Sequence, residues 1–235
     1  MKLNRAERWV VNNPLRVFQQ QIEIKWLKQV LALAPGAAVL EVGCGRGAGA
    51  QLILRTFRPA RLHIQDLDIE MVLKARQYLA MDELKKATLS VGDAVCLSFK
   101  TGTLDAVFGF GFLHHVPDWR SALSEVSRVL KTGGIYYFEE LYPQLYQNFI
   151  TKHIVLHPEH DRFSSHDLRA GLDRTGLTLK KAFEIKKIGI LGVAAKGHRK
   201  TATLGLRALR KCKKCGRRFT YVKKGKTSKP TDSSA

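Results

Sequence analysis

The sequence predicts an α/β protein built on a doubly wound, mostly parallel, seven-stranded sheet, and three observations support this. Short apolar runs alternate with amphipathic runs from residue 37 to residue 140, the pattern of a parallel sheet covered on both faces. A glycine-rich turn directly follows the first apolar run, as in sheets that bind a ligand at the carboxyl ends of their strands. Two apolar runs separated by a short basic turn, within residues 177–195, predict an antiparallel last strand.

The size and composition of the chain fit one globular domain with an added tail. Its 235 residues are 45% hydrophobic, which is ordinary for a globular fold. No apolar run approaches the roughly 20 residues of a transmembrane helix, and the first residues lack the apolar stretch of a secretory signal. We therefore expect a cytoplasmic protein without a transmembrane segment.

The first predicted element is a helix that begins near residue 14. Asn13 suits the N-cap position, and Pro14 suits the first helical position. Apolar residues then recur at helical spacing, namely Phe18, Ile22, Trp26 and Val30. The tripeptide APG at residues 34–36 ends this pattern, and we expect residues 1–34 to form a helical lid.

Strand-like and helix-like runs then alternate. The strand-like runs occupy residues 38–42, 61–67, 87–93, 103–113 and 135–140. The helix-like runs occupy residues 47–57, 69–79 and 118–130. Right-handed crossovers between parallel strands then produce a doubly wound sheet.

The pattern becomes irregular after residue 140. Residues 141–170 contain many tyrosines and histidines without a clean period, so we expect an insertion there. Ser164 and Asp167 are spaced as a capping box, and Gly176 suits the end of the helix that follows. Two final strand-like runs complete one domain over residues 35–195, which leaves residues 196–235 as a tail.

The most informative motif is the turn in AAVLEVGCGRGAGA, residues 37–50. Glycine lets the backbone approach a ligand closely, and Gly43, Gly45 and Gly47 supply such a turn. A dinucleotide site needs G-x-G-x-x-G, which Gly43, Gly45 and Ala48 only approximate. A carboxylate at Glu41 would repel a pyrophosphate and attract a cation. The motif therefore favours S-adenosylmethionine, which carries an ammonium and a sulfonium group and no phosphate.

Four segments resemble, in order and spacing, the motifs of class I S-adenosylmethionine-dependent methyltransferases. They are VLEVGCGRGAG, LHIQDLDIEMVLKAR, SVGDAV and the long run LDAVFGFGFLHHVPDWRSALSEVSRVLKTGGIYYFEE. The last is similar to the branch that methylates small molecules and lipids, which includes the quinone-biosynthesis enzymes. The resemblance covers residues 36–140 well and residues 160–195 loosely. It implies a Rossmann-like methyltransferase fold with S-adenosylmethionine as cofactor.

The resemblance also implies which residues hold the cofactor. Asp66 would bind both ribose hydroxyls, because one carboxylate can accept two hydrogen bonds; Asp68 is the neighbouring alternative. Asp93 would accept the adenine amino group, and the backbone of Ala94 would meet the ring. The complete predicted cofactor set is Glu41, Gly43, Cys44, Gly45, Gly47, Asp66, Leu67, Asp93, Ala94, Phe110 and Gly111.

Candidates for a catalytic base follow the fourth and fifth strand-like runs. Methyl transfer is an in-line displacement, and it needs a base only where the nucleophile must lose a proton. The candidates are His115, His114 and Glu139, with Glu140 beside them. The alternative is that LHHVPD is scaffold, because it resembles a run found in this branch with different substrates. Tyr142 and Tyr146 are candidates for the acceptor wall, with packing as the alternative, and residues 141–170 would close the acceptor side.

The net charge of +20 is concentrated in the tail. Residues 196–235 carry 14 Lys or Arg and a single acid, Asp232. Such a tail attracts polyanions, here RNA or an anionic membrane surface; a solvated tail without a partner is the alternative.

Two partial metal motifs occur. Cys212 and Cys215 form half of a zinc ribbon, so zinc is a candidate there, although no second CxxC pair exists and a reduced pair is the alternative. Four histidines cluster in sequence at irregular spacing, and we predict a lid rather than a metal site for them: His153, His157, His160 and His166.

We therefore expect an enzyme that methylates a small-molecule or lipid-like acceptor by direct displacement. One alternative is an RNA or ribosomal-protein methyltransferase recruited by the basic tail. Another is a non-catalytic protein that binds polyanions on the same scaffold. Methylation of base amino groups is disfavoured because GFGFLHH replaces the usual Asn- or Asp-Pro-Pro-aromatic run, and Cys96 lies on the wrong loop for methylation of cytosine carbon. A lipid acceptor would add peripheral attachment to a membrane.

Overall fold

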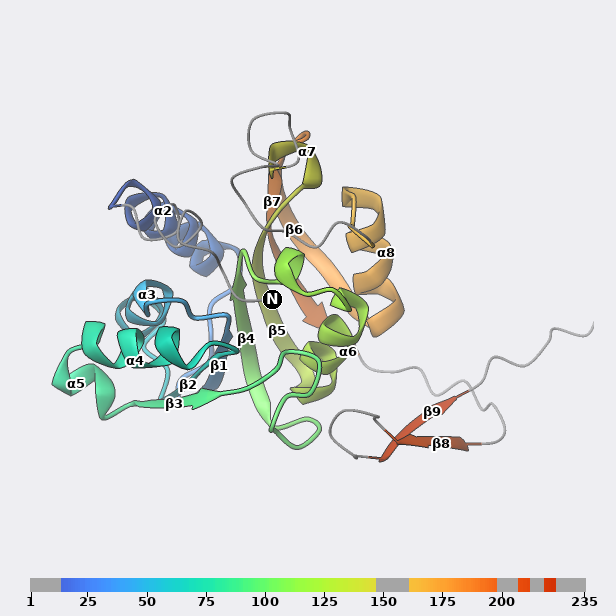
Figure 1. The fold of residues 1–235 in the computed structure, drawn as a ribbon, viewed down its shortest axis with the longest axis horizontal. Helices are drawn as coiled ribbons and strands as arrows, with labels where there is room; N and C mark the ends of the chain where they lie inside the picture. Colours follow the sequence, from blue (N-terminus) through green and yellow to red (C-terminus); the bar gives the residue numbers. More distant parts are fainter. Residues whose placement is uncertain (1–13, 147–160, 198–206, 212–217, 223–235) are drawn as a thin grey trace, which may run out of the picture. The chain divides into compact units, whose positions relative to one another are not determined.

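The computed structural model describes residues 14–146, 161–197, 207–211 and 218–222, and the chain divides into two units, Met1–His198 and Arg199–Ala235. The first unit contains a seven-stranded sheet in the order β3-β2-β1-β4-β5-β7-β6 (Figure 1). The change of direction at β1 and β4 is the mark of a doubly wound sheet. The predicted α/β fold class is thereby confirmed.

The strands of this sheet are β1 Ala38–Val42, β2 Arg61–Asp66, β3 Ala87–Val91, β4 Leu104–Phe110, β5 Leu130–Leu141, β6 Leu177–Ile185 and β7 Gly189–Lys196. The helices are α2 Pro14–Val30, α3 Ala48–Thr56, α4 Ile69–Tyr78, α5 Met81–Leu84, the 3₁₀ turn η1 Leu113–His115, α6 Trp119–Val129, α7 Pro143–Tyr146 and α8 Ser165–Thr175. The second unit contains β8 Arg207–Lys211 paired antiparallel with β9 Arg218–Val222.

Strands β1 to β5 run in parallel, and β7 alone reverses direction. Strand β1 pairs in parallel with β2 and β4, while β7 is antiparallel to both β5 and β6. The predicted antiparallel last strand is confirmed, and it inserts between β5 and β6 instead of extending the edge. The carboxyl ends of β1 to β5 consequently share one edge of the sheet, where the predicted ligand residues lie.

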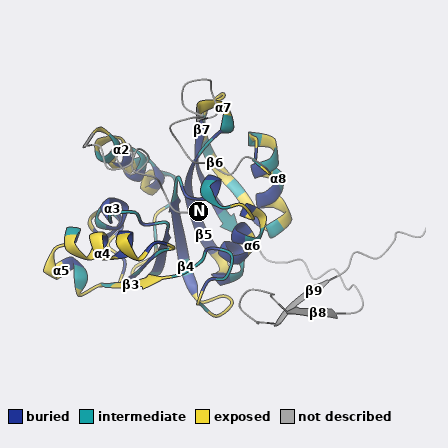
Figure 2. Cartoon of the chain, in the orientation of Figure 1, coloured by how far each residue is buried: buried dark blue, intermediate teal, exposed yellow. Residues whose placement is uncertain are grey.

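Helices cover both faces of the sheet (Figure 1). Helices α2, α3 and α4 pack on one face around a core that includes Leu27, Ile53 and Phe108. Helices α6 and α8 pack on the other face, with Trp119 and Leu172 in its core. Figure 2 shows that the central strands are buried over most of their length.

Helix α2 turns a different face inward from the one that its apolar spacing favours. The buried residues are Gln20, Ile24 and Leu27, whereas Phe18 and Ile22 are exposed. Both stripes have helical spacing, so the sequence alone did not separate them. The inner stripe packs against α3 and β7. The helix itself is present as predicted; Phe18 and Ile22 of its outer apolar stripe face solvent, whereas Trp26 and Val30 are half-buried against the core.

The capping signals of α8 appear as predicted. Ser164 is the N-cap: its hydroxyl accepts the amide hydrogen of Asp167, whose carboxylate accepts the amide hydrogen of Ser164 in return. Gly176 ends the helix in the left-handed conformation. The helix lies across residue 170, where we expected the insertion to end. Within the described ranges, none of the helices combines the length and apolar composition that a membrane crossing requires.

Candidate functional site

The glycine turn after β1 is tightly packed on one side and open on the other. Gly43, Gly45 and Gly47 all have positive φ angles, of 74°, 52° and 94°. A Cβ atom on Gly43 would lie 2.5 Å from Cβ of Phe112, so this glycine permits close packing against the turn that follows β4. A Cβ atom on Gly45 would meet nothing within 4 Å. The turn therefore presents a bare backbone to open space at Gly45.

Glu41 places a buried carboxyl group directly beneath this turn. Its side chain is 2% exposed, and its Oε2 atom accepts no hydrogen bond from the described residues. A Cβ atom on Gly49 would lie 2.1 Å from Oε1 of Glu41 and 3.1 Å from the amide nitrogen of Gln20, so α2 and α3 both close over the group. Burial, with the nearby charge of Asp66, raises the pKa of Glu41 to about 8. An orphaned buried carboxyl oxygen suits a cationic ligand.

Asp66 ends β2 and joins the glycine turn to the next loop. Its Oδ2 accepts the amide hydrogen of Gly45 at 3.0 Å, and its Oδ1 accepts the amide hydrogen of Asp68 at 2.9 Å. The backbone of Leu67 also hydrogen-bonds this carboxylate, which with its two oxygens has room for further hydrogen bonds from a ligand. Asp68 instead caps α4 by accepting the amide hydrogen of Glu70. The two aspartates therefore have different structural partners.

The remaining predicted cofactor residues lie along the same edge of the sheet. Asp93 and Ala94 follow β3, and Oδ1 of Asp93 accepts the amide hydrogen of Val95 at 3.1 Å. Cys44 is buried within the glycine turn, and Leu67 is exposed after β2. Phe110 and Gly111 end β4, where the amide of Gly111 donates to the carbonyl of Glu139 at 2.7 Å. The structure thus brings residues from four strand ends together.

His114 and Glu140 form a buried pair on the α6 face of the sheet. Nδ1 of His114 lies 2.8 Å from Glu140, whose carboxylate also accepts the amide hydrogens of Leu113 and His114. Burial lowers the pKa of His114 to about 3, with the charge of Arg162 adding to the shift, and burial raises the pKa of Glu140 to about 8. The two side chains hydrogen-bond each other, and the carboxyl group of Glu140 fixes η1 against β5.

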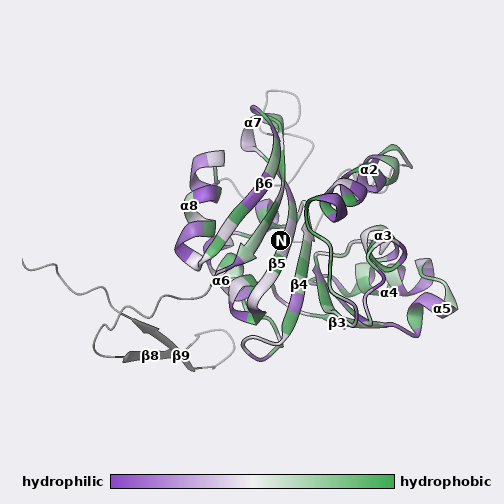
Figure 3. Ribbon diagram, turned by 180° about the vertical axis from the view of Figure 1, so that it is seen from behind, coloured by the Kyte–Doolittle hydropathy of each residue, from purple (hydrophilic) through white to green (hydrophobic). Residues whose placement is uncertain are grey.

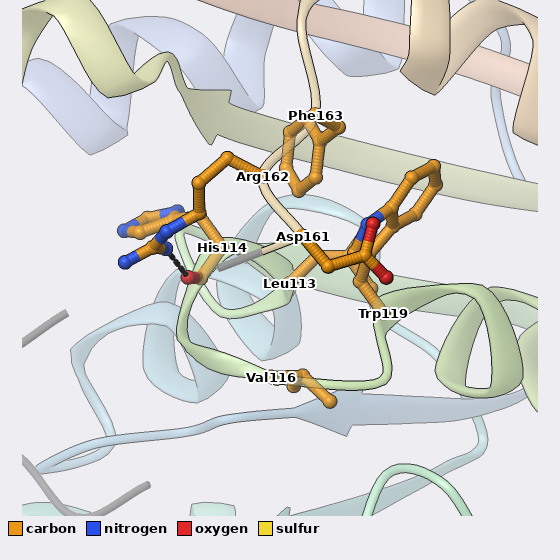
Figure 4. A pocket seen from close by; sticks show the side chains of 7 residues that line it. All are labelled: Leu113, His114, Val116, Trp119, Asp161, Arg162 and Phe163. Atoms are coloured by element: carbon orange, nitrogen blue, oxygen red, sulfur yellow. Dashed lines mark hydrogen bonds between the residues drawn. The ribbon is translucent and has the colours of Figure 1, made fainter. Parts of the chain in front are cut away.

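Arg162 completes this arrangement from the chain segment before α8. Its Nη1 atom donates to the carbonyl oxygen of His114 at 2.7 Å (Figure 4). The hollow beside it is lined by Leu113, His114, Val116, Trp119, Asp161, Arg162 and Phe163 and has almost no internal volume. The ring of His115 lies 4.3 Å from that of His114. This side of η1 is packed.

Glu139 points to the opposite face of β5, toward α2. Arg16 pairs with Glu139 and, at 2.9 Å, with Glu23. Burial raises the pKa of Glu139 to about 7, and the charge of Arg16 opposes that rise. The sequence did not reveal this ion pair, because its partners are 123 residues apart and only Glu139 lies in one of the motifs.

An apolar groove of about 390 Å³ opens beside Glu139, between α2 and the β6–β7 hairpin. Its apolar lining comes from Ile22, Trp26, Leu141, Phe183, Ile185, Ile188, Ile190 and Leu191. Its polar lining consists of Gln19, Glu23, Glu139 and Glu140. The only sequence signal for it was the apolar content of residues 183–191, which we assigned to the sheet.

Of the other predicted residues, Tyr142 is hydrogen-bonded to a neighbouring side chain, and several lie outside the part of the chain that the structure describes. Tyr142 is buried, and its hydroxyl donates to Glu184 at 2.7 Å. The side chain of Tyr146 is not among those described, nor are His153, His157, His160, Cys212 and Cys215. Among the described residues, no group of three or more His, Cys, Asp or Glu is placed to hold a metal.

Comparison with known proteins agrees with this geometry. Residues 39–134 match the family model described as "Methyltransferase domain". The chain is 37% identical over 109 residues to a fatty-acid O-methyltransferase of Mycolicibacterium smegmatis, covering 46% of this chain and 39% of that protein. It is 34% identical over 111 residues to a phthiotriol/phenolphthiotriol dimycocerosates methyltransferase of Mycobacterium tuberculosis, covering 46% and 39%.

Solved structures show the same fold at lower identity. The crystal structure of a SAM-dependent methyltransferase from Aquifex aeolicus superposes with a TM-score of 0.65 at 19% identity, covering 83% of this chain and all of that one. The matched region spans about two-fifths of the length of the two mycobacterial relatives. The agreement therefore concerns one domain.

Proposed function

We propose that the methyltransferase domain of this chain is of the class I S-adenosylmethionine-dependent kind and that it methylates a lipid-like acceptor bound in the groove between α2 and the β6–β7 hairpin. One observation carries the proposal: α2 borders both candidate sites. Gln20 of α2 lies over Glu41 beneath the glycine turn, while Ile22 and Trp26, within two turns of the same helix, line the groove. Cofactor and acceptor would then lie side by side.

The residues of the glycine turn fit the cofactor. When bound, S-adenosylmethionine supplies an electrophilic methyl group on a positively charged sulfur. The buried carboxyl group of Glu41 would ionise on binding and place a negative charge near the cationic part of the ligand, and Asp66 would offer two acceptor oxygens to the ribose. Asp93 and Ala94 extend this cradle to the adenine. Most of the protein's contribution is positioning, because displacement at a sulfonium needs little further activation.

The groove that would bind the methyl acceptor also contains a general base, for substrates that must lose a proton. Glu139 lines the groove, and its pKa of about 7 suits general-base work near neutral pH. Arg16 holds its carboxylate in place. The His114–Glu140 pair is a positioning device, because it is buried and fixes the turn between β4 and α6. His115, exposed in part beside it, is the alternative base.

Relatives support a lipid-like acceptor. The two named mycobacterial proteins are methyltransferases of a fatty acid and of phthiotriol dimycocerosates. An apolar groove of about 390 Å³ is large enough for part of such a chain. The test is to incubate the protein with radiolabelled cofactor and fractionated extract. Label in the lipid fraction supports the proposal, and label confined to RNA or protein contradicts it.

A second candidate function is methylation of RNA or a ribosomal protein, favoured by the charge of residues 196–235 alone. In the same experiment it predicts label in the RNA or protein fraction, with incorporation that falls steeply as salt rises. A non-catalytic polyanion binder on the same scaffold would label no fraction.

Cofactor binding is expected to release a proton from Glu41. The carboxyl group is neutral below pH 8 in the free protein, and a nearby cation stabilises its ionised form. Affinity should therefore rise with pH up to about 8 and then level off. Calorimetric titration at pH 7 in two buffers of different ionisation enthalpy measures the released proton. Glu41→Gln should remove the buffer dependence, and equal heats for the wild-type protein would contradict this assignment.

A charged side chain on the groove wall is expected to slow methylation of the acceptor without changing cofactor binding. Ile22→Asp places a carboxylate among apolar side chains, so kcat/KM for a lipid-like acceptor should fall at least about tenfold. Cofactor affinity should stay unchanged. The matched control is Leu73→Asp on α4, because Leu73 is 51% exposed and Ile22 is 56% exposed. Equal losses in both variants would place the acceptor elsewhere.

A further inference from the structure

Two apolar strips flank the mouth of the groove and face solvent. Leu15, Phe18 and Ile22 form one strip on α2 at i, i+3 and i+7 spacing, and Phe183, Ile185 and Ile188 form the other on the β6–β7 hairpin. These six residues, here termed the apolar rim, are between 43% and 75% exposed. Figure 2 shows exposed residues on both elements.

The two strips belong to one surface. Ile22 from the first strip and all three residues of the second line the same groove. Leu15 and Phe18 continue the stripe of Ile22 toward the start of α2, since residues three and four apart share a helix face. The hydropathy pattern of α2 and β6 in Figure 3 shows apolar segments on both elements. Clustered exposed apolar side chains of this size mark an interaction surface.

The charges around the apolar rim have one sign. The exposed charged residues of α2 and the hairpin are Lys25, Lys28, Lys180, Lys181, Lys186 and Lys187. The acids on the same elements have cationic partners: Glu23 shares Arg16 with Glu139, and Glu184 pairs with Arg169. The rim therefore combines apolar side chains with a surround of unbalanced positive charge.

We propose that the apolar rim docks the protein on an anionic lipid bilayer, with the groove opening onto the acyl layer. Apolar side chains that enter the interface while lysines contact anionic headgroups are the elements of peripheral membrane binding. The identity of what enters the groove rests on the proposed function. The docking itself does not, because it requires neither cofactor nor turnover.

Other occupants fit the same surface less well. A second copy in a symmetric contact would bring two lysine-rich surfaces together, which is repulsive. RNA would satisfy the lysines, but single strands bind to stacked aromatic side chains, and four of the six rim residues are Leu or Ile. A bilayer satisfies both the apolar and the charged part.

The experiment measures co-sedimentation of the full chain, without cofactor, with vesicles of phosphatidylglycerol and phosphatidylcholine or of phosphatidylcholine alone. Each apolar side chain that enters the bilayer contributes roughly a factor of ten to partitioning. The double variant Phe18→Ser, Ile185→Ser should therefore bind anionic vesicles about a hundredfold more weakly. The matched control Leu73→Ser, Met81→Ser removes exposed apolar residues from α4 and α5, and it should bind like the wild-type protein.

High salt distinguishes vesicle binding through the apolar rim from vesicle binding through the basic tail. The tail attracts anionic vesicles by charge, which about 0.5 M salt screens within a few ångströms, whereas the apolar contribution persists. Wild-type protein should stay partly bound at that salt concentration, and the rim variant should be released. Equal binding of variant and wild type, or a concentration-dependent dimer that only the rim variant loses, would overturn the proposal. An unchanged unfolding temperature and an unchanged cofactor affinity show that the rim variant is folded. The proposed function is tested separately, by measuring transfer of the labelled methyl group to an acceptor dispersed in detergent.

Discussion

Replacing Asp66 by alanine is expected to weaken binding of S-adenosylmethionine by at least about a hundredfold. Two hydrogen bonds from ribose hydroxyls to a carboxylate are worth about 1.5–3 kcal/mol each. The substitution also removes the acceptor of the Gly45 amide, so the open part of the glycine turn loses its anchor. Both effects act in the same direction. Calorimetric titration of the cofactor measures the loss.

Two variants make this result specific. Asp66→Asn keeps one acceptor oxygen and should give an intermediate affinity, since it can satisfy either the turn or a ribose hydroxyl but loses the charge. Asp173→Ala removes an exposed carboxylate from α8, on the opposite face of the sheet, and should leave affinity unchanged. Thermal unfolding checks that Asp66→Ala remains folded. An affinity for a folded Asp66→Ala within about threefold of wild type would show that the carboxylate does not face the ribose.

The fold was predictable because its signals are local. Each strand of the central sheet is a short apolar run next to an amphipathic helix, and this alternation leaves few topologies. The ends of α8 were predictable for the same reason, because Ser164 and Gly176 act through contacts within a few residues. The position of β7 between β5 and β6 involves pairing across about 50 residues, and the sequence indicated only that this strand is antiparallel.

The cofactor cradle was predictable from topology as well as motif. Glu41, Asp66 and Asp93 come from β1, β2 and β3, which are neighbours with parallel directions, so their carboxyl ends must meet. The acceptor side follows no such rule. The apolar spacing of α2 fits two faces, and only packing against α3 and β7 selects Ile24 and Leu27 for the core. The groove, and the pairing of Arg16 with Glu139, depend on that selection.

The second large effect is expected on stability, in Gly43→Ala. At φ 74° an alanine is strained, and its Cβ atom would lie 2.5 Å from Cβ of the buried Phe112. Backbone strain of about 1 kcal/mol and overpacking of about 1–3 kcal/mol add to a loss of roughly 2–4 kcal/mol. Denaturant unfolding measures this loss as a lower midpoint without a change in slope.

Gly102→Ala separates the two causes. Gly102 has a similar φ of 68°, but a Cβ atom there would meet nothing within 4 Å, so this variant should lose only the roughly 1 kcal/mol of backbone strain. The difference between the two variants then reports how tightly the glycine turn packs against the loop after β4. Equal losses would mean that Phe112 can yield and that the turn has space behind it. A turn with such space is free to shift away from Asp66. In that case the bound cofactor, and not the packing at Gly43, would fix the shape of the cofactor site.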